Sequence, residues 1–306
     1  MTMKAGNKNR KWNIFLEKYG MYYLMLTPLL LCLLVFSYLP MVGILYAFTD
    51  YTPFKQELSF VGWANFKTLF ANKGFWQAFK NTLQISTVRL MISTLGSIGL
   101  ALLLDELCSL KFRKLVQTVV YIPHFMSWVV VASIFTMILS PKTGFINSII
   151  ESLGREKIYF LANKNWWRPW LYLISLWKEV GWGAIIYVSA LAGVDMEQHE
   201  AAIMDGANRI QRVWHITLPA ISNTIVVVFI LNLAKVLNLF EPVWVLQNSM
   251  VIGVSDVIET YVYRMGISGA QYGVSTAAGL FKSVISVLFV LVGNKLSKKL
   301  TGEEVI

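Results

Sequence analysis

The sequence predicts an all-α membrane protein with six transmembrane helices, and three observations carry this prediction. Hydrophobic residues make up 56% of the 306 residues and charged residues only 14%, whereas an average soluble domain has roughly 25% charged residues. The mean hydropathy is +0.56. Apolar runs long enough to cross a bilayer, about 20 residues each, recur along the chain. With so few charges to coat a globule of this size, we expect lipid to supply much of its solvent.

Six apolar runs define the expected spans. They lie at 21–47, 78–104, 115–139, 169–192, 220–247 and 273–294. Each should be helical, because lipid offers the backbone no hydrogen-bond partners. We therefore expect a segment at 1–20, a single transmembrane domain at 21–294 and a tail at 295–306. An even number of spans places both ends of the chain on the same side of the membrane.

Basic residues place that side in the cytoplasm. The net charge of +10 could suggest nucleic acid, but in so apolar a chain we attribute it to basic residues at cytoplasmic membrane edges. The expected inner segments hold Lys4, Lys8, Arg10, Lys11, Lys18, Lys111, Arg113, Lys114, Lys295, Lys298 and Lys299. The opposite loops also hold basic residues, but long loops weigh less in this rule. We predict a multi-pass protein with both termini cytoplasmic and no nucleic-acid partner.

The largest inner loop, residues 193–219, has the local chemistry of a helix followed by a bend. Asp195 can cap a helix that starts at the next residue. Ala201 and Ala202 favour that helix and leave a smooth face that another protein can approach. Gly206 can adopt a positive φ, which is a common way to end a helix.

A second short helix and a turn should follow in the same loop. Asn208 can cap the second helix, which carries Arg209. Pro219 should mark the turn into the fifth span, because the residue before a proline avoids the helical region. Local chemistry alone leaves an alternative open, in which this is an ordinary amphipathic loop lying on the membrane surface.

The loop also carries a specific sequence pattern. It fits E-A-A, three residues, G, nine residues, I-x-L-P at every fixed position, namely Glu200, Ala201, Ala202, Gly206, Ile216, Leu218 and Pro219. This pattern resembles the coupling-helix loop by which membrane subunits of ATP-binding-cassette (ABC) importers receive force from a separate ATPase. The resemblance implies the type I importer permease fold. It also implies that these residues, with Asp205 and Arg209, couple the chain to the ATPase.

Three further segments are similar to the permeases of carbohydrate-uptake ABC importers. They are Phe60–Phe66, Tyr121–Pro123 and Glu259–Tyr263. Among those permeases the chain resembles the first of two unlike subunits, the maltose and glycerol-phosphate type, and looks nearest to oligosaccharide and polysaccharide-fragment permeases of Gram-positive bacteria. The maltose permease has extra amino-terminal spans and a large outer domain that this chain lacks, so contacts made by those parts do not carry over.

The resemblance implies a complex in the bacterial cell membrane. Its other members would be a second permease subunit, two ATP-binding-cassette ATPase subunits and an extracellular solute-binding lipoprotein, with membrane lipid around them and a carbohydrate as cargo. ATP and Mg would bind to the partner ATPase, since this sequence contains no G-x-x-x-x-G-K-[ST] phosphate loop. No nucleophile–base pair is readable, and the three histidines are too scattered for a metal site. We expect a non-catalytic subunit that holds no cofactor or metal.

Polar residues inside the spans are candidates for the transport pathway, because charges within a membrane are costly. In the expected fifth span Asn232, Lys235, Asn238 and Glu241 recur every three residues, a spacing that winds around a helix of 3.6 residues per turn. Pro242 follows them and should release a backbone carbonyl.

We expect the pathway to be lined by Asn232, Asn238, Glu241 and Trp177 or Trp182. In the alternative interpretation the charges pair to lock helices together, for example Lys235 with Glu179, and the tryptophans pack or face lipid.

Three other functions compete with a carbohydrate importer. A stand-alone secondary transporter would have inverted repeats and paired intramembrane acids, and neither is evident. A membrane enzyme would need acids, histidines or metal ligands clustered at one interface. An importer of an amino acid, a phosphonate or another anion fits the same loop pattern, and the sequence separates it least well.

Overall fold

The computed structural model describes residues 5–53 and 58–301, with side chains described from residue 17 onward except at 296 and 299–301. The expected segments 1–20 and 295–306 are therefore described only in part. Within the described ranges every regular element is helical, and the nearest approach to a sheet is a single antiparallel bridge between Thr49 and Phe60. The all-α prediction is confirmed.

The helices follow one another along the chain as α1 (Ala5–Leu33), η1 (Leu34–Tyr38), η2 (Leu39–Phe48), α2 (Ala64–Ala71), α3 (Lys73–Asp105), α4 (Leu110–Tyr121), η3 (Ile122–Phe125), α5 (Trp128–Ile138), α6 (Phe145–Ser152), η4 (Phe160–Ala162), α7 (Lys164–Leu191), α8 (Met196–Met204), α9 (Arg209–Arg212), η5 (Val213–Thr217), α10 (Leu218–Ala220), α11 (Ser222–Ala234), α12 (Phe240–Leu246), α13 (Ile252–Ser255), α14 (Ile258–Tyr263), η6 (Arg264–Ser268) and α15 (Tyr272–Thr301).

Four helical stretches are long and apolar enough to cross a bilayer by themselves. They are Glu17–Phe48, which runs from α1 through η2, then α3, α7 and the Tyr272–Lys295 part of α15. Two bent pairs pass the same test together: Leu110–Phe125 with Trp128–Ile138, bent by 102°, and Arg209–Ala220 with Ser222–Ala234, bent by 64°. The described chain thus holds four spans, or six when each bent pair counts as one.

The third expected span, 115–139, is not a single helix. Pro123 introduces a 3₁₀ turn, and Met126 then leaves helical geometry with ψ 140°. Ser127 starts a new helix, because its Oγ accepts the N–H of Val130 at 3.3 Å. A proline inside a helix removes one hydrogen bond and crowds the preceding turn, which explains why the span breaks here.

The fifth expected span, 220–247, ends early. α11 stops at Ala234, residues 235–239 are irregular, and α12 starts at Phe240. The polar residues predicted as a winding stripe therefore do not share one helix. Pro242 occupies the third position of α12, where a backbone N–H has no partner within the helix, so the expected release of a carbonyl does not occur.

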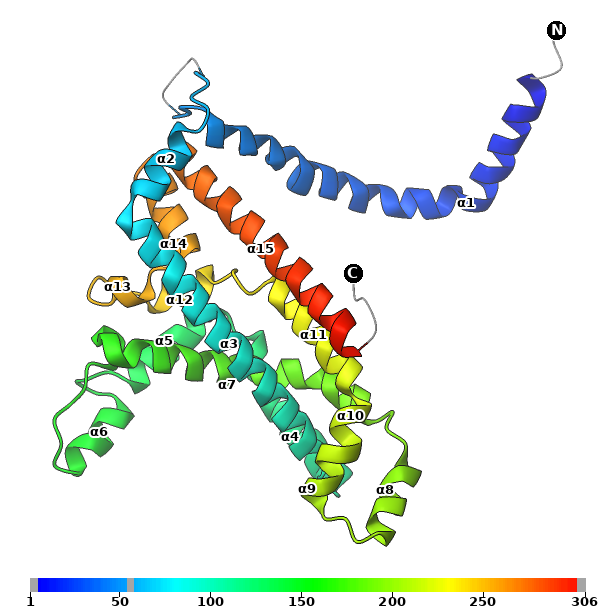
Figure 1. The fold of residues 1–306 in the computed structure, drawn as a ribbon, viewed down its shortest axis with the longest axis vertical. Coiled ribbons are helices and arrows are strands. Elements are labelled where there is room, and N and C mark those ends of the chain that lie inside the picture. Colours follow the sequence, from blue (N-terminus) through cyan, green and yellow to red (C-terminus); the bar gives the residue numbers. More distant parts are fainter. Residues whose placement is uncertain (1–4, 54–57, 302–306) are drawn as a thin grey trace.

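α3 and α7 form the central helix pair, which Figure 1 shows crossing in the middle of the molecule. Small residues allow the close approach: a Cβ at Gly183 of α7 would overlap the hydroxyl of Ser97 on α3, and a Cβ at Gly181 would overlap the backbone carbonyl of Val120. The buried apolar cluster beside this pair includes Ile85, Trp128, Trp167, Leu171, Ile174 and Val243.

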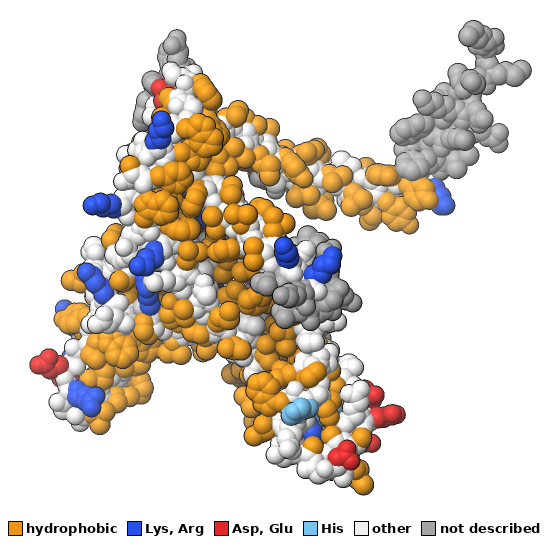
Figure 2. Space-filling model, in the orientation of Figure 1, with side chains coloured by type: hydrophobic (Ala, Val, Ile, Leu, Met, Phe, Trp, Pro, Cys, Tyr) orange, Lys and Arg blue, Asp and Glu red, His pale blue; other side chains and the backbone are white. Residues whose placement is uncertain are grey.

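The first apolar stretch projects away from the bundle. Figure 1 shows α1 extending from the end of the molecule near α2, whereas α11 and α15 lie side by side within the bundle. None of the most apolar 18-residue window in Glu17–Phe48 is buried, and Figure 2 shows hydrophobic side chains along its surface. Only its last residues join the core, where Ala47 is fully buried in a cluster with Phe66 and Val274.

The close approach at Gly181 can be tested with Gly181→Ala. The added methyl group would meet the carbonyl oxygen of Val120, and no heavy atom lies within 4 Å of the equivalent position at Gly99. Overpacking of this kind costs about 1–3 kcal/mol. In thermal unfolding of the purified protein we expect Gly181→Ala to lower the Tm by several degrees and Gly99→Ala to leave it unchanged. Equal Tm values for both variants would contradict the packing argument.

Candidate functional site

The first helix of the 193–219 loop has the predicted ends. The carboxylate of Asp195 accepts the N–H of Glu197 at 2.9 Å and begins α8. Gly206 ends it with φ +79°. The N–H of Gly206 donates to the carbonyl of Ile203 at 3.0 Å, and the N–H of Ala207 donates to that of Ala202 at 2.9 Å. These two bonds satisfy carbonyls that a helix end otherwise leaves unpaired, so the bend at Gly206 is a defined corner.

The second helix is capped reciprocally, as its sequence predicts. The N–H of Gln211 donates to Asn208 Oδ1 at 2.9 Å, and the N–H of Asn208 donates to Gln211 Oε1 at 2.8 Å. Arg209 then reaches Glu106, at the end of α3, with 3.1 Å between Nη1 and Oε2. Both side chains are exposed, so the pair adds about 1 kcal/mol at most, but it fixes where the loop meets α3.

The predicted turn at Pro219 is wrong by two residues. Leu218 is helical, with φ −65° and ψ −43°, and its N–H donates to the carbonyl of Val213. The five residues before it form a π-helical turn, a wider turn often inserted within α-helices, which leaves room for the proline ring. The helix therefore continues through Pro219 to Ala220, and the chain bends at Ile221.

Apolar side chains are exposed at the tip of the loop. Met204 is 87% exposed, Ile210 70% and Trp214 65%. Figure 2 shows hydrophobic side chains with acidic groups at their edge on the lobe that α8 and α9 occupy in Figure 1. Large apolar groups exposed together indicate a contact surface for another molecule.

The predicted coupling residues surround these apolar side chains. Half-buried positions are Ala202, Ile216 and Leu218, and exposed positions are Glu200, Ala201, Asp205, Gly206, Arg209 and Pro219. Sequence analysis missed the apolar residues at the tip, although large apolar residues in a polar loop were a usable signal.

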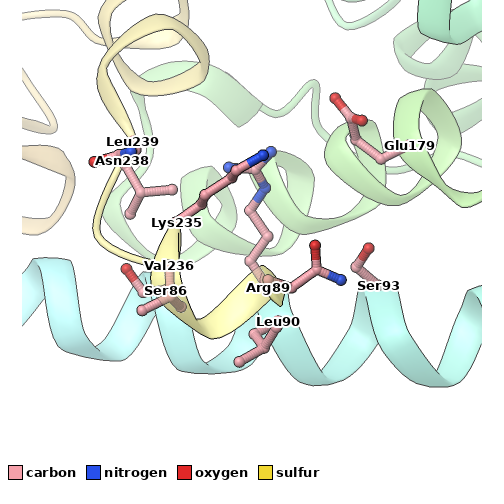
Figure 3. A pocket seen from close by; sticks show the side chains of 10 residues that line it. Ser86, Arg89, Leu90, Ser93, Glu179, Lys235, Val236, Asn238 and Leu239 are labelled. Atoms are coloured by element: carbon pink, nitrogen blue, oxygen red, sulfur yellow. The ribbon is translucent and has the colours of Figure 1, made fainter. Parts of the chain in front are cut away.

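A polar cavity of about 360 Å³ lies at the break in the fifth span, within the size range of small-molecule sites. α3 contributes one wall, α7 and α11 contribute one residue each, and the irregular segment 235–239 closes it. Figure 3 shows the lining side chains, which are Ser86, Arg89, Leu90, Ser93, Glu179, Asn232, Lys235, Val236, Asn238 and Leu239.

The structure brings some of the predicted pathway residues together and separates others. Asn232 and Asn238 both line the cavity. Trp182 stacks on His124 with 4.4 Å between ring centroids, and it lines a smaller adjoining cavity together with Asn232. Glu241 is exposed at the start of α12, and Trp177 packs edge-on against Phe135 at 5.5 Å. Neither of these two residues lines the cavity at the break.

The ion pair suggested for Lys235 and Glu179 does not form. Glu179 instead meets Nδ1 of His124 at 3.2 Å and Nζ of Lys178 at 4.0 Å. Lys178 is buried, and its ammonium group donates to the carbonyl of His124 at 2.7 Å. Arg89 also lines the cavity. As a charge within an expected span it is a functional candidate from the sequence, although it was not among the predicted pathway residues.

A second charged cluster fixes the irregular segment. The carboxylate of Glu259 accepts the N–H of Leu239 at 2.7 Å and pairs with the ammonium group of Lys282 at 2.6 Å. Lys282 also donates to Asn238 Oδ1 at 3.0 Å. Non-helical backbone at membrane depth is tolerated only where it is buried in protein or lines a cavity, so the break and the cavity belong together.

The structure combines a helical membrane bundle, a polar cavity at a broken span and a loop with exposed apolar side chains. These features are those of a permease that is driven by a partner protein. Residues 97–302 match the binding-protein-dependent transport system inner membrane components, and the chain belongs to this family. It is a multi-pass membrane protein and the non-catalytic transmembrane subunit of an ABC importer.

Proteins similar over nearly the whole chain agree with this assignment. Protein LplB of Bacillus subtilis is 45% identical to this chain, and the alignment covers 99% of this chain and 96% of LplB. The polygalacturonan/rhamnogalacturonan transport system permease protein YteP of the same organism is 45% identical over 92% of this chain and 88% of its own. A chain of a bacterial ABC transporter involved in the import of the acidic polysaccharide alginate superposes with a TM-score of 0.87 at 38% identity, covering 95% of this chain and 99% of that one.

The corner at Gly206 generates a prediction for transport. Its φ of +79° costs most residues about 1–2 kcal/mol, and more when the side chain is β-branched. Gly206→Val should therefore abolish uptake and uncouple ATP hydrolysis, while the external binding protein still binds its cargo. Gly206→Asn is the matched control, because asparagine tolerates this conformation. Normal uptake by the valine variant, or equal loss in both variants, would count against a rigid corner.

The amide groups of the cavity generate a second prediction. Asn232→Leu and Asn238→Leu should each lower uptake about tenfold, since one or two hydrogen bonds of about 1 kcal/mol each are lost to a polar cargo. The complex should still assemble, which co-purification would measure. Asn165→Leu, at an exposed position at the start of α7, should transport normally. Unchanged uptake by the Asn232 and Asn238 variants would remove both residues from the pathway.

Proposed function

We propose that this chain forms, together with a second permease subunit, the membrane pathway of an ABC importer for oligosaccharides. The named cargoes of its relatives support a carbohydrate: one is a polygalacturonan/rhamnogalacturonan permease and another belongs to an alginate importer. The polar cavity with Asn232 and Asn238 has the planar amide groups that bind sugar hydroxyls.

The 193–219 loop docks on an ATP-binding-cassette ATPase, two copies of which bind ATP and Mg. The observation that carries this step is the group of exposed apolar side chains around the Gly206 corner, with Met204 87% exposed at its tip. Because the ATPase works in the cytoplasm, docking of this kind requires the loop, and with it both termini, to lie on the cytoplasmic side. An extracellular solute-binding lipoprotein delivers the cargo on the opposite face.

The second permease completes the pathway. The cavity is open on one side, because three of its lining residues are exposed: Asn232, Lys235 and Asn238. A cavity of this kind fits one half of a channel whose other half is a second subunit. The apolar stretch Glu17–Phe48, of which the most apolar window is unburied, adds a large surface for lipid or for that subunit.

Movement reaches the cavity through the helices on either side of the loop. α7 leads into the loop and carries Glu179, and α11 leaves the loop and carries Asn232. When ATP closes the ATPase dimer, the loop shifts these two walls relative to each other. Access to the cavity then alternates between the two membrane faces, and the cargo leaves inward after hydrolysis.

Docking can be tested with Met204→Asp. The buried carboxylate would be costly at an apolar contact, so ATPase subunits should no longer co-purify and ATP-dependent uptake should fall to background. Met250→Asp, at a residue that is 67% exposed in another loop, should retain the ATPase. Retention of the ATPase by the Met204 variant would contradict the docking step.

Crosslinking and thiol labelling test on which side of the membrane the loop lies. In a variant that carries Met204→Cys and has serine at the two native cysteines, Cys32 and Cys108, a thiol crosslinker should join the chain to the ATPase. An impermeant thiol reagent added outside intact cells should leave position 204 unlabelled. Labelling from outside would overturn the orientation and the docking surface together.

A further inference from the structure

Two cations line the cavity without a close ion-pair partner. Arg89 enters from α3, and Lys235 enters from the residue that ends α11 (Figure 3). Neither side chain has an ion-pair partner within 4.0 Å among the residues that the structure describes. An intramembrane charge left unpaired is costly and indicates function, and two like charges in one small cavity add mutual repulsion.

Glu179 is the single carboxylate that lines the cavity, and its negative charge acts on Arg89 as well as on other groups. Glu179 meets His124 at 3.2 Å and Lys178 at 4.0 Å. Arg89, Lys178 and Lys235 thus face one negative charge, so this side of the cavity carries an excess of positive charge. An anion bound between Arg89 and Lys235 would relieve the imbalance.

The side chain of Arg89 is also held in place by an aromatic ring. Its guanidinium lies over the ring of Trp128, 5.8 Å from the centroid, and the indole is buried. Stacking of this kind fixes the plane of the guanidinium while its N–H groups stay available. A guanidinium with free donors matches the two oxygens of a carboxylate, whereas Lys235 supplies an adaptable point charge.

We propose that Arg89 and Lys235 form an anion-selecting site of the pathway, which binds the carboxylates of an acidic oligosaccharide as it passes. This inference rests on the proposed oligosaccharide import and narrows its cargo to sugars that carry uronate groups. Asn232 and Asn238, which line the same cavity, would bind the hydroxyls of the same sugar rings.

A neutral sugar gives these two cations nothing to pair with. A competing explanation is that acidic side chains of the second permease neutralise them, in which case the charges would hold the two subunits together. The two explanations differ in what is lost on substitution: cargo selection in the first case, and assembly in the second.

The test uses the whole importer, with binding protein and ATPase, in vesicles of zwitterionic lipid so that no anionic headgroup is present. Uptake is measured for tetrasaccharides of galacturonate, mannuronate and glucuronate, for their methyl esters, and for a neutral glucose tetrasaccharide. The permease variants are Arg89→Gln, Lys235→Gln and the two combined. Lys111→Gln is the matched control, because Lys111 is exposed at the start of α4, away from the cavity.

We expect wild-type importer to take up at least one of the acidic tetrasaccharides at least tenfold faster than its methyl ester. Arg89→Gln and Lys235→Gln should each reduce that uptake about tenfold and the combined variant further, while the second permease and the ATPase still co-purify with the variants in wild-type amounts. Lys111→Gln should match wild type.

Two results would overturn the site. One is uptake of the neutral tetrasaccharide or a methyl ester as fast as the acid, unchanged in the variants. The other is loss of the second permease from the Arg89 or Lys235 variants, which would assign both charges to the subunit contact. Failure of the wild type to move any tetrasaccharide, acidic or neutral, would instead count against the proposed import of oligosaccharides.

Discussion

The carboxylate of Glu259 is the interaction on which the cavity depends. One of its oxygens accepts the N–H of Leu239 and the other pairs with Lys282, which also holds the side chain of Asn238. The N–H groups of Lys235, Val236 and Asn238 find carbonyls within the turn, and Glu259 supplies the acceptor for Leu239 in surroundings where unsatisfied backbone groups are expensive. Without such an anchor the break after Ala234 would be unfavourable, and a continuous helix would fill the space that the cavity occupies.

The same break bears on the proposed coupling between the 193–219 loop and the cavity. α7 contributes Glu179 from its middle and α11 contributes Asn232 near its C-terminal end, and the 193–219 loop lies between the two helices in the chain. In the proposed mechanism, helices joined by defined corners at Gly206 and Ile221 would convert a shift of the loop into a shift of the cavity wall.

Sequence reasoning succeeded where the determinants are local. The caps at Asp195 and Asn208 and the positive φ of Gly206 depend on a few neighbouring residues, and all three were predicted correctly. It failed where distant residues decide. The residues near Ala234 do not predict that the helix ends there, because the carboxylate that accepts a hydrogen bond from the unwound segment belongs to Glu259, 25 positions later. The prediction therefore placed Asn232 and Asn238 on one helix, although both do line the same cavity; the roles of the coupling and pathway residues stay predictions.

The projecting stretch Glu17–Phe48 bears on how the protein is made. Its most apolar part touches little of its own chain, and a helix in lipid satisfies its backbone by itself. It therefore gains almost nothing from the later helices while it enters the bilayer. The segment can therefore enter lipid before α15, which packs beside its last residues, has been synthesised.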